Sequence, residues 1–262
     1  MQYEVYQIDA FTNKVFGGNP ACVVPLKEWL PDELLLNITK ENAVAETAFF
    51  IVNDNDISLR WFTPEFEMDL CGHATLASAH VLKTFLGYTN NTMVFTTVSG
   101  KLTVTAEDGM YTLNFPSRKP VPCELPDLIQ RSLGKQPNEV LKARDYVLVY
   151  DTEEDVRNIN INRQILDEIN LDPGGVIITA KGDDCDFVSR FFTSQASIFE
   201  DPVTGSAHCS LIPYWSVKLG KKQMVALQLS QRLGTLYCVD DGERVLIKGH
   251  AKTYSKGVFW IE

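Results

Sequence analysis

The sequence lacks the patterns that mark several large classes of protein. Its 262 residues include only four histidines, and its six cysteines are scattered without a CxxC pair, which disfavours a structural zinc ribbon and a disulfide scaffold. No stretch approaches about 18 consecutive apolar residues. The N-terminal MQYEVYQIDAF has neither the basic nor the apolar region of a secretory leader. We therefore expect a cytoplasmic chain with reduced thiols, no metal centre and no membrane partner.

Positive charge is also scarce. The chain has 24 Lys and Arg against 34 Asp and Glu, for a formal net charge of -10. Nucleic acids and anionic membranes bind clustered Lys and Arg, so this balance argues against both as partners. The hydrophobic content of 45% is that of an ordinary globular enzyme with one large or two modest domains. A small neutral or anionic substrate, held by local groups, is the expected ligand.

What the chain does contain is an internal repeat. Residues Arg60–Thr63 read RWFT and residues Arg190–Thr193 read RFFT, and each is followed by an acidic stretch and then by a Gly-x-Ala step. The steps begin at Gly72 and Gly205, and each opens an apolar segment that ends in Leu-Gly 15 residues later. We interpret this correspondence as two related halves.

The segments that flank the repeat predict an α+β fold. Upstream, residues 29–52 and 163–181 each read as a helix followed by a short apolar strand. Downstream, residues 99–113 and 232–247 alternate apolar and polar positions around an Asp-Gly, which is typical of a hairpin.

The proline-dense segment 116–126 is predicted to link the two halves as extended, unpaired chain. We therefore expect an N-terminal half over residues 1–116 and a C-terminal half over residues 117–254. The final strand, 255–262, could pack on either half.

The two glycine steps predict an anion-binding device. A glycine that opens a helix lets a ligand approach the backbone and leaves the first N–H groups available to it. If the halves face each other, Gly72 with His73 and Gly205 with Ser206 could hold a carboxylate or stabilise a developing enolate. Ordinary helix-start turns would explain both glycines equally well.

Two carboxylates stand beside these elements. Glu46 directly precedes the apolar run AFFIV, where partial desolvation would tune an acid for proton transfer; a solvent-facing strand-edge glutamate is the alternative. The second half offers no acid at the corresponding place, which favours a single base. Asp201 lies four residues before Gly205 and could orient a substrate group or cap the helix.

The histidines allow a metal interpretation as well. His73 opens a helix, where it could carry a proton near neutral pH. His80 lies seven residues further along the same helical face, and His208 and Asp201 could complete a metal site. The absence of an HExxH-like pair disfavours this metal-assisted hydrolase.

Taken together, these stretches resemble the phenazine-biosynthesis F protein family. The motifs are DAFTNKVFGGNPACVV (Asp9–Val24), AETAFF around Glu46, RWFTPEFEMDLCGHAT around His73 and EDPVTGSAH around Asp201, in this order along essentially the whole chain. The resemblance implies the fold of diaminopimelate epimerase: two similar halves related by pseudo-twofold symmetry, each a curved, barrel-like sheet around a central helix, with the active site in the cleft between them.

The resemblance also implies a function. It predicts a cofactor-independent isomerase, a homodimer, that shuttles a proton between carbons of a small cyclic or amino carboxylic acid. Glu46 is then both general base and general acid, His73 and Asp201 bind and polarise the substrate, and Gly72, Gly205 and Ser206 line its pocket. One carboxylate shielded from water can return a proton to a different carbon without an external carrier.

Two other functions stay open. Cys71 directly precedes Gly72, as a catalytic cysteine precedes glycine in diaminopimelate epimerase, and this would suggest a thiol-dependent epimerase or racemase. Such enzymes need a second cysteine, but the repeat places Thr204 opposite Cys71. The other alternative is a small-acid binding protein that keeps the anion pocket and has no turnover.

Overall fold

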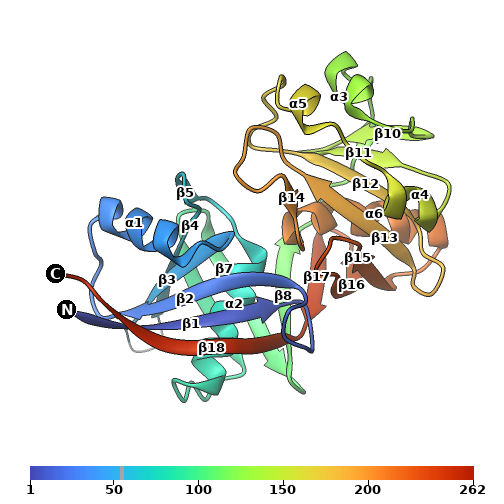
Figure 1. Cartoon of the computed structure of the whole chain (residues 1–262). Coiled ribbons are helices and arrows are strands. Elements are labelled where there is room, and N and C mark those ends of the chain that lie inside the picture. Colours follow the sequence, from blue (N-terminus) through green and yellow to red (C-terminus); the bar gives the residue numbers. More distant parts are fainter. Residues whose placement is uncertain (54–55) are drawn as a thin grey trace. The chain divides into compact units, whose positions relative to one another are not determined.

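The computed structural model describes residues 1–53 and 56–262, and the chain divides into two compact units (Figure 1). One unit comprises Met1–Asn114 together with Lys248–Glu262, and the other comprises Phe115–Ile247. Each combines strands with helices, so the fold is α+β as predicted. Within the described residues, no helix is both long enough and apolar enough to cross a membrane.

The first unit is built mainly from strands that pair along one continuous path. Their bounds are β1 (Gln2–Ala10), β2 (Asn19–Leu26), β3 (Glu46–Asn53), β4 (Asp56–Phe62), β5 (Glu67–Met68), β6 (Thr92–Thr97), β7 (Gly100–Glu107), β8 (Met110–Pro116, which ends just beyond this unit) and β18 (Ala251–Trp260). The pairs β2–β3 and β4–β6 are parallel, while β18–β1, β1–β2, β3–β4, β6–β7 and β7–β8 are antiparallel. The C-terminal strand thus joins this unit through β1.

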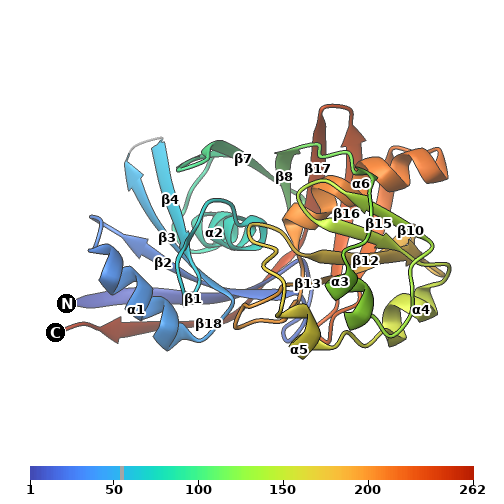
Figure 2. The same cartoon turned by 90° about the horizontal axis from the view of Figure 1, so that it is seen from above.

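Two helices pack against this sheet. Helix α1 (Asp32–Asn42) contacts β3 and β4, whereas α2 (Gly72–Thr84) contacts β1, β2, β3, β7 and β18. Figure 2 shows α2 inside the curve of these strands. Most residues of α2 are buried, which is the behaviour of a helix enclosed on most sides. Its small Gly, Ala and Ser residues keep it thin enough to lie within a curled sheet.

The second unit contains thirteen of the named elements. They are β9 (Val121–Pro122), α3 (Asp127–Ser132), β10 (Glu139–Lys142), β11 (Tyr146–Val149), α4 (Glu153–Asn158), α5 (Arg163–Leu166), β12 (Val176–Lys181), β13 (Phe187–Phe192), β14 (Glu200–Asp201), α6 (Gly205–Leu219), β15 (Gln223–Gln228), β16 (Gly234–Asp241) and β17 (Arg244–Gly249, which runs past the unit's end). The pairs β11–β12 and β13–β15 are parallel, and β12–β13 and β15–β16 are antiparallel.

Helix α6 lies in the core of the second unit. Most of its residues are buried although Pro213 interrupts its hydrogen bonding. The indole of Trp215 donates a hydrogen bond of 2.9 Å to the Thr179 hydroxyl on β12 and stacks on the Phe187 ring of β13 at 5.8 Å between centroids. These contacts fix the helix against two central strands.

The arginines of the repeated RWFT and RFFT motifs form ion pairs with the short strands that precede α2 and α6. Arg60 forms a forked pair with Glu67, at 2.7 and 2.6 Å. Arg190 pairs in the same way with Glu200, at 2.7 and 3.0 Å. Forked guanidinium–carboxylate pairs fix orientation as well as distance. Each pair ties a long strand to the two-residue strand that precedes the buried helix, and thereby positions the start of that helix.

One local prediction is wrong. Segment 116–126 is not entirely unpaired, because Val121 and Pro122 form a short strand against β10. The helix and the strand predicted within 163–181 are both present, although the helix is short: α5 has four residues, and β12 follows it.

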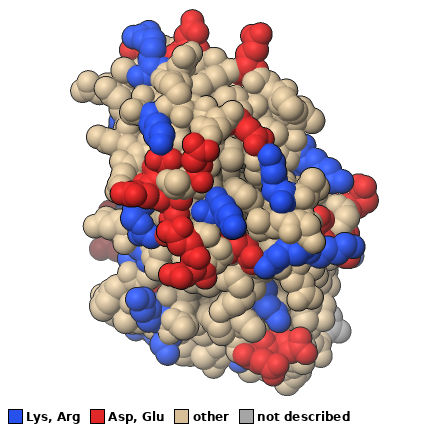
Figure 3. Space-filling model, turned by 90° about the vertical axis from the view of Figure 1, so that its right-hand side faces the viewer, with Lys and Arg blue, Asp and Glu red and all other residues tan. Residues whose placement is uncertain are grey.

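The composition predicts no clustered Lys and Arg, and the surface can be compared with that expectation. On the face shown in Figure 3, acidic and basic side chains are interspersed, and the basic ones form no continuous field.

Candidate active site

Glu46 begins β3 and faces the buried helix α2. The side chains of a strand alternate between the two faces of a sheet, and Phe49 and Ile51 pack in the cluster that contains Leu35 of α1. Glu46, which is offset from them by an odd number of positions, therefore points to the opposite face. There its Oε2 atom lies 3.0 Å from Nε2 of His73, the second residue of α2.

This pair is shielded from solvent but not sealed. The side chain of His73 is 5% exposed and that of Glu46 is 16% exposed. The two atoms are close enough for an ion pair, although their approach lies outside the angular range of a hydrogen bond. The exposed part of Glu46 is the part that a substrate or water could reach.

The other edge of the His73 ring has two neighbours. Its Nδ1 atom is 3.2 Å from the amide nitrogen of Asn19 and 3.6 Å from the sulfur of Cys71. Asn19 begins β2, and Cys71 is the residue before α2. The imidazole thus stands between a carboxylate on one edge and an amide and a thiol on the other.

The electrostatics of this group favour proton chemistry. Burial by itself would lower the pKa of His73, but its interactions with Cys71 and Glu46 outweigh burial and raise that pKa well above its ordinary value. Burial also raises the pKa of the Cys71 thiol, more than His73 lowers it. A thiol in that state is a poor nucleophile at neutral pH, because the thiolate is the reactive form.

The same residues could be considered as metal ligands. One ligand atom each from Glu46, Cys71 and His73 lie within 4.8 Å of one another. However, the sulfur lies on the Nδ1 edge of the imidazole and the carboxylate on the Nε2 edge. Because a ring nitrogen binds an ion along its own lone pair, one ion could reach all three groups only if the ring turned. The arrangement fits a proton-transfer pair better than a metal centre.

The second unit holds the other predicted residues. Asp201 lies in β14 and accepts a hydrogen bond of 2.5 Å from the hydroxyl of Thr204. Gln228 bridges the turn: its amide nitrogen donates to the Asp201 carbonyl at 2.8 Å, and its oxygen accepts from the Thr204 N–H at 2.9 Å. Gly205 is the buried first residue of α6, and Ser206 follows it half-buried. Asp201 is therefore held at the helix start by a short network.

Both buried helices begin without a cap from their own N-cap residue. Cys71 precedes α2 and Thr204 precedes α6, and neither side chain accepts a hydrogen bond from its helix. Gly72 and Gly205 are the first residues of the two helices, as the sequence predicted. Helix starts of this kind can present backbone N–H groups to an anion.

His80 and His208, which the metal interpretation invoked, have structural surroundings. Both nitrogens of His80 are engaged, with Tyr111 at 3.1 Å and Thr253 at 2.8 Å. His208 donates from Nδ1 to the Thr204 carbonyl at 2.8 Å, the direction that the carbonyl requires. Burial lowers the pKa of each histidine to about 4, with Lys252 adding to the effect at His80 and the Thr204 carbonyl opposing it at His208.

These two histidines predict a loss of stability in mild acid. Their folded pKa is below the unfolded value of 6.5, so the unfolded chain binds more protons between those limits and stability falls as pH falls through that window. Each contributes a slope of up to about 1.4 kcal/mol per pH unit. Urea unfolding of the protein and of His80→Gln, at about pH 7 and about pH 5, measures it. The variant should lose less stability on acidification, and equal losses would contradict the assignment.

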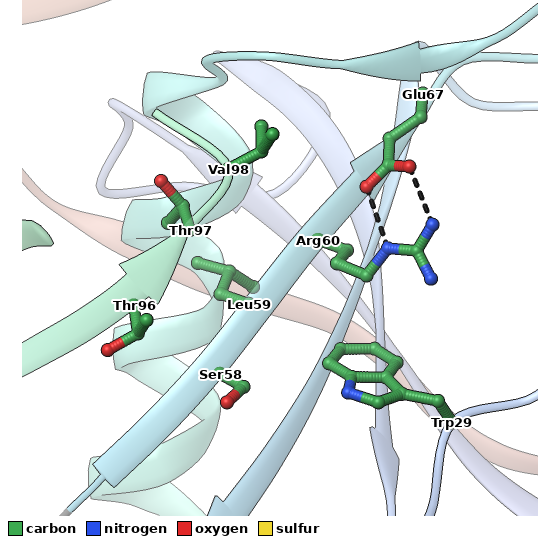
Figure 4. Close-up of a pocket in the computed structure, with 8 residues that line it drawn as sticks. All are labelled: Trp29, Ser58, Leu59, Arg60, Glu67, Thr96, Thr97 and Val98. Atoms are coloured by element: carbon green, nitrogen blue, oxygen red, sulfur yellow. Dashed lines mark hydrogen bonds and ion pairs between the residues drawn. The ribbon is translucent and has the colours of Figure 1, made fainter. Parts of the chain in front are cut away.

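A hollow of about 330 Å³ lies on the other face of the first unit's sheet (Figure 4). Its lining includes Trp29, Arg60, Glu67 and Val98, and does not include Glu46 or His73. The guanidinium of Arg60 is already engaged by Glu67, as the dashed lines in Figure 4 show, and by an exposed aspartate of α1. This hollow is therefore separate from the Glu46–His73 pair and offers little free charge to a ligand.

Sequence reasoning missed two residues of these networks, Asn19 and Gln228. Asn19 lies inside the motif Asp9–Val24, and the match of that motif to the family pattern was a signal that the segment matters. The contact of Asn19 with His73 was not evident from the sequence. Gln228 ends β15 and carries no motif.

Comparison with known proteins places these observations in a class. The chain is 45% identical over 261 residues to an uncharacterized isomerase of Pseudomonas aeruginosa, with 100% of both chains covered. The crystal structure of a phenazine biosynthesis protein PhzF family member from Enterococcus faecalis covers 100% of both chains at 44% identity and a TM-score of 0.95. A hydroxyproline epimerase from Agrobacterium vitis shares the fold at a TM-score of 0.61 and 11% identity, over 98% of this chain and 92% of that one. The protein is an isomerase.

The family follows from the sequence match. The model of the family described as phenazine biosynthesis-like protein (PhzC-PhzF) matches residues 8–257, and the chain belongs to that family. The resemblance noted from the motifs is thereby confirmed.

Proposed function

We propose that this isomerase moves a proton between two carbons of a small cyclic or amino carboxylic acid without a cofactor, and that Glu46 carries the proton. The observation that carries this proposal is the Glu46 carboxylate, which is mostly buried and lies 3.0 Å from a histidine at the start of a buried helix. Such a carboxylate can act as base and then as acid in one catalytic cycle.

The proposed reaction balances within the substrate. The Glu46 carboxylate takes a proton from a carbon next to an electron-withdrawing group, and the electron pair of the broken C–H bond delocalises as an enolate. The protonated Glu46 then returns the proton to another carbon, where a new C–H bond forms and the double bond migrates. No oxidant or other reactant is consumed.

Charge on the enolate needs a positive partner. The N-terminus of α2, with Gly72 and the imidazole of His73, supplies N–H groups and positive potential next to Glu46. We propose that Asp201, Gly205 and Ser206 also bind substrate, since the turn between β14 and α6 presents them together. The positive potential at the N-terminus of α2 favours substrates that carry a carboxylate.

Exchange of hydrogen with solvent tests the proposal. The purified protein is incubated in D₂O with a panel of small cyclic and amino carboxylic acids, and deuterium uptake at carbon is followed by ¹H NMR and mass spectrometry. The 16% exposure of Glu46 lets its proton exchange with water between turnovers, so a substrate should gain deuterium at a specific carbon. Reactions without protein provide the background rate.

The rival functions give different outcomes. A compound that raises the melting temperature of the protein but gains no deuterium supports the small-acid binding protein. Exchange that is lost on replacement of Cys71 by Ser but persists in Glu46→Gln supports the thiol-dependent epimerase. The raised pKa of the buried Cys71 thiol argues against the latter.

A further inference from the structure

Asn19 occupies an unusual place for an amide side chain. It is fully buried at the start of β2, and its amide nitrogen lies 3.2 Å from Nδ1 of His73, on the ring edge opposite Glu46. The three side chains come from β2, α2 and β3, which meet on the face of the sheet that covers α2. Asn19 is thus positioned to influence Glu46 through the histidine.

The chemistry of this contact depends on where His73 carries its proton. An amide nitrogen is only a donor, so a neutral imidazole that meets it must accept through Nδ1 and carry its proton on Nε2. That proton then faces the Glu46 carboxylate. If the ring takes a second proton, Nδ1 becomes a donor and Asn19 must turn its oxygen to meet it.

We propose that Asn19 is a positioning residue that, when His73 is neutral, holds its proton on Nε2, at the ring edge that lies beside Glu46. This inference rests on the proposed function, in which Glu46 is the base. Because the pKa of His73 is raised by its interactions with Cys71 and Glu46, this neutral tautomer is populated above that raised pKa. The groups that face the His73 ring are Glu46 from β3, Cys71 from the residue before α2 and Asn19 from β2.

The backbone around Asn19 keeps the amide in place. Pro20 follows it and restricts Asn19 to an extended conformation, and β1 pairs with it through Ala10. Gly18 precedes it at φ +61°, where an added Cβ would overlap the carbonyl oxygen of Ala10. The preceding loop is closed by the Asp9 carboxylate, which accepts a hydrogen bond of 2.9 Å from the Phe16 N–H. The amide is therefore preorganised before a substrate arrives.

The substitution Asn19→Asp tests this role by reversing the polarity of the contact. A carboxylate can only accept, so it favours a proton on Nδ1 and stabilises the doubly protonated ring between two negative groups. Ring-¹⁵N-labelled histidine NMR reports the tautomer without any substrate. The His73 signals are assigned by their loss in His73→Gln.

The expected result, at a pH above the raised pKa of His73, is that the neutral ring carries its proton on Nε2 in the unaltered protein. In Asn19→Asp, Nδ1 becomes protonated and the ring titrates at a higher pH. A matched control is Asn42→Asp, because Asn42 donates to Thr47 at 3.1 Å on the opposite face of the same sheet. It adds the same charge beside β3 and should leave the His73 tautomer unchanged.

An identical tautomer and titration in Asn19→Asp and in the unaltered protein overturns the proposal, as does an equal shift in the Asn42→Asp control. Should Asn19→Asp fail to fold, Asn19→Ala serves instead: it removes the donor, and an unchanged Nδ1 signal then overturns the role. Deuterium exchange should fall roughly tenfold or more in Asn19→Asp. If Asn19→Asp alters the His73 tautomer but the unaltered protein exchanges no substrate, the proposed function alone is contradicted. The two failures are therefore distinguishable.

Discussion

Glu46→Gln is expected to abolish deuterium exchange into the substrate while the protein stays folded. Glutamine has nearly the size and shape of glutamate, but its amide cannot take a proton from carbon near neutral pH. The loss should reach roughly 10²–10⁴-fold or more, the contribution of a positioned acid or base. The rate of deuterium uptake by NMR measures it, and the melting temperature checks the fold.

Two controls make the Glu46 result specific. Glu41→Gln removes the same charge from an exposed position near the end of α1, and it should exchange like the unaltered protein. Glu46→Asp keeps the carboxylate but draws it back by one methylene, so a reduced rate should remain. Full exchange in Glu46→Gln would contradict the role of Glu46 as the base, whichever substrate is used.

The elements that carry the candidate site were largely predictable because their signals are local. Gly72 and Gly205 open helices because each is followed by small and apolar residues over about four turns, with no proline in the first turn. The Asp-Gly at residues 108–109 joins β7 to β8 because both residues take positive φ, as such a turn requires. Glu46 begins a strand because a continuous apolar run follows it.

The contacts within the site were not predictable in the same way. Asn19 meets His73 across a separation of 54 residues, and no local pattern encodes which side chain meets which at that distance. The pairing of the C-terminal strand with β1 is likewise a long-range choice, extending from Trp260 opposite Gln2 to Ala251 opposite Ala10. The apolar run after Glu46 indicates a buried strand, but it does not indicate that α2 would cover the face to which Glu46 points.

The loop that leads to Asn19 gives the second large effect, because Gly18→Ala should destabilise the protein by about 2–5 kcal/mol. The left-handed φ of +61° costs an alanine about 1–2 kcal/mol. The added Cβ would also overlap the Ala10 carbonyl oxygen, a backbone atom that β1 holds in place, and overpacking of that kind adds about 1–3 kcal/mol. Urea unfolding measures the difference from the unaltered protein.

Gly87→Ala separates the two causes, since Gly87 has φ +66° but no heavy atom within 4 Å of an added Cβ. It should cost only the backbone strain, about 1–2 kcal/mol, and equal losses at the two positions would contradict the steric clash. Because Gly18 directly precedes Asn19, relief of the clash must displace the amide that contacts His73. A folded fraction of Gly18→Ala should therefore also show an altered His73 tautomer, whereas Gly87→Ala should not, and this difference links the conformation of one loop glycine to the proton that faces Glu46.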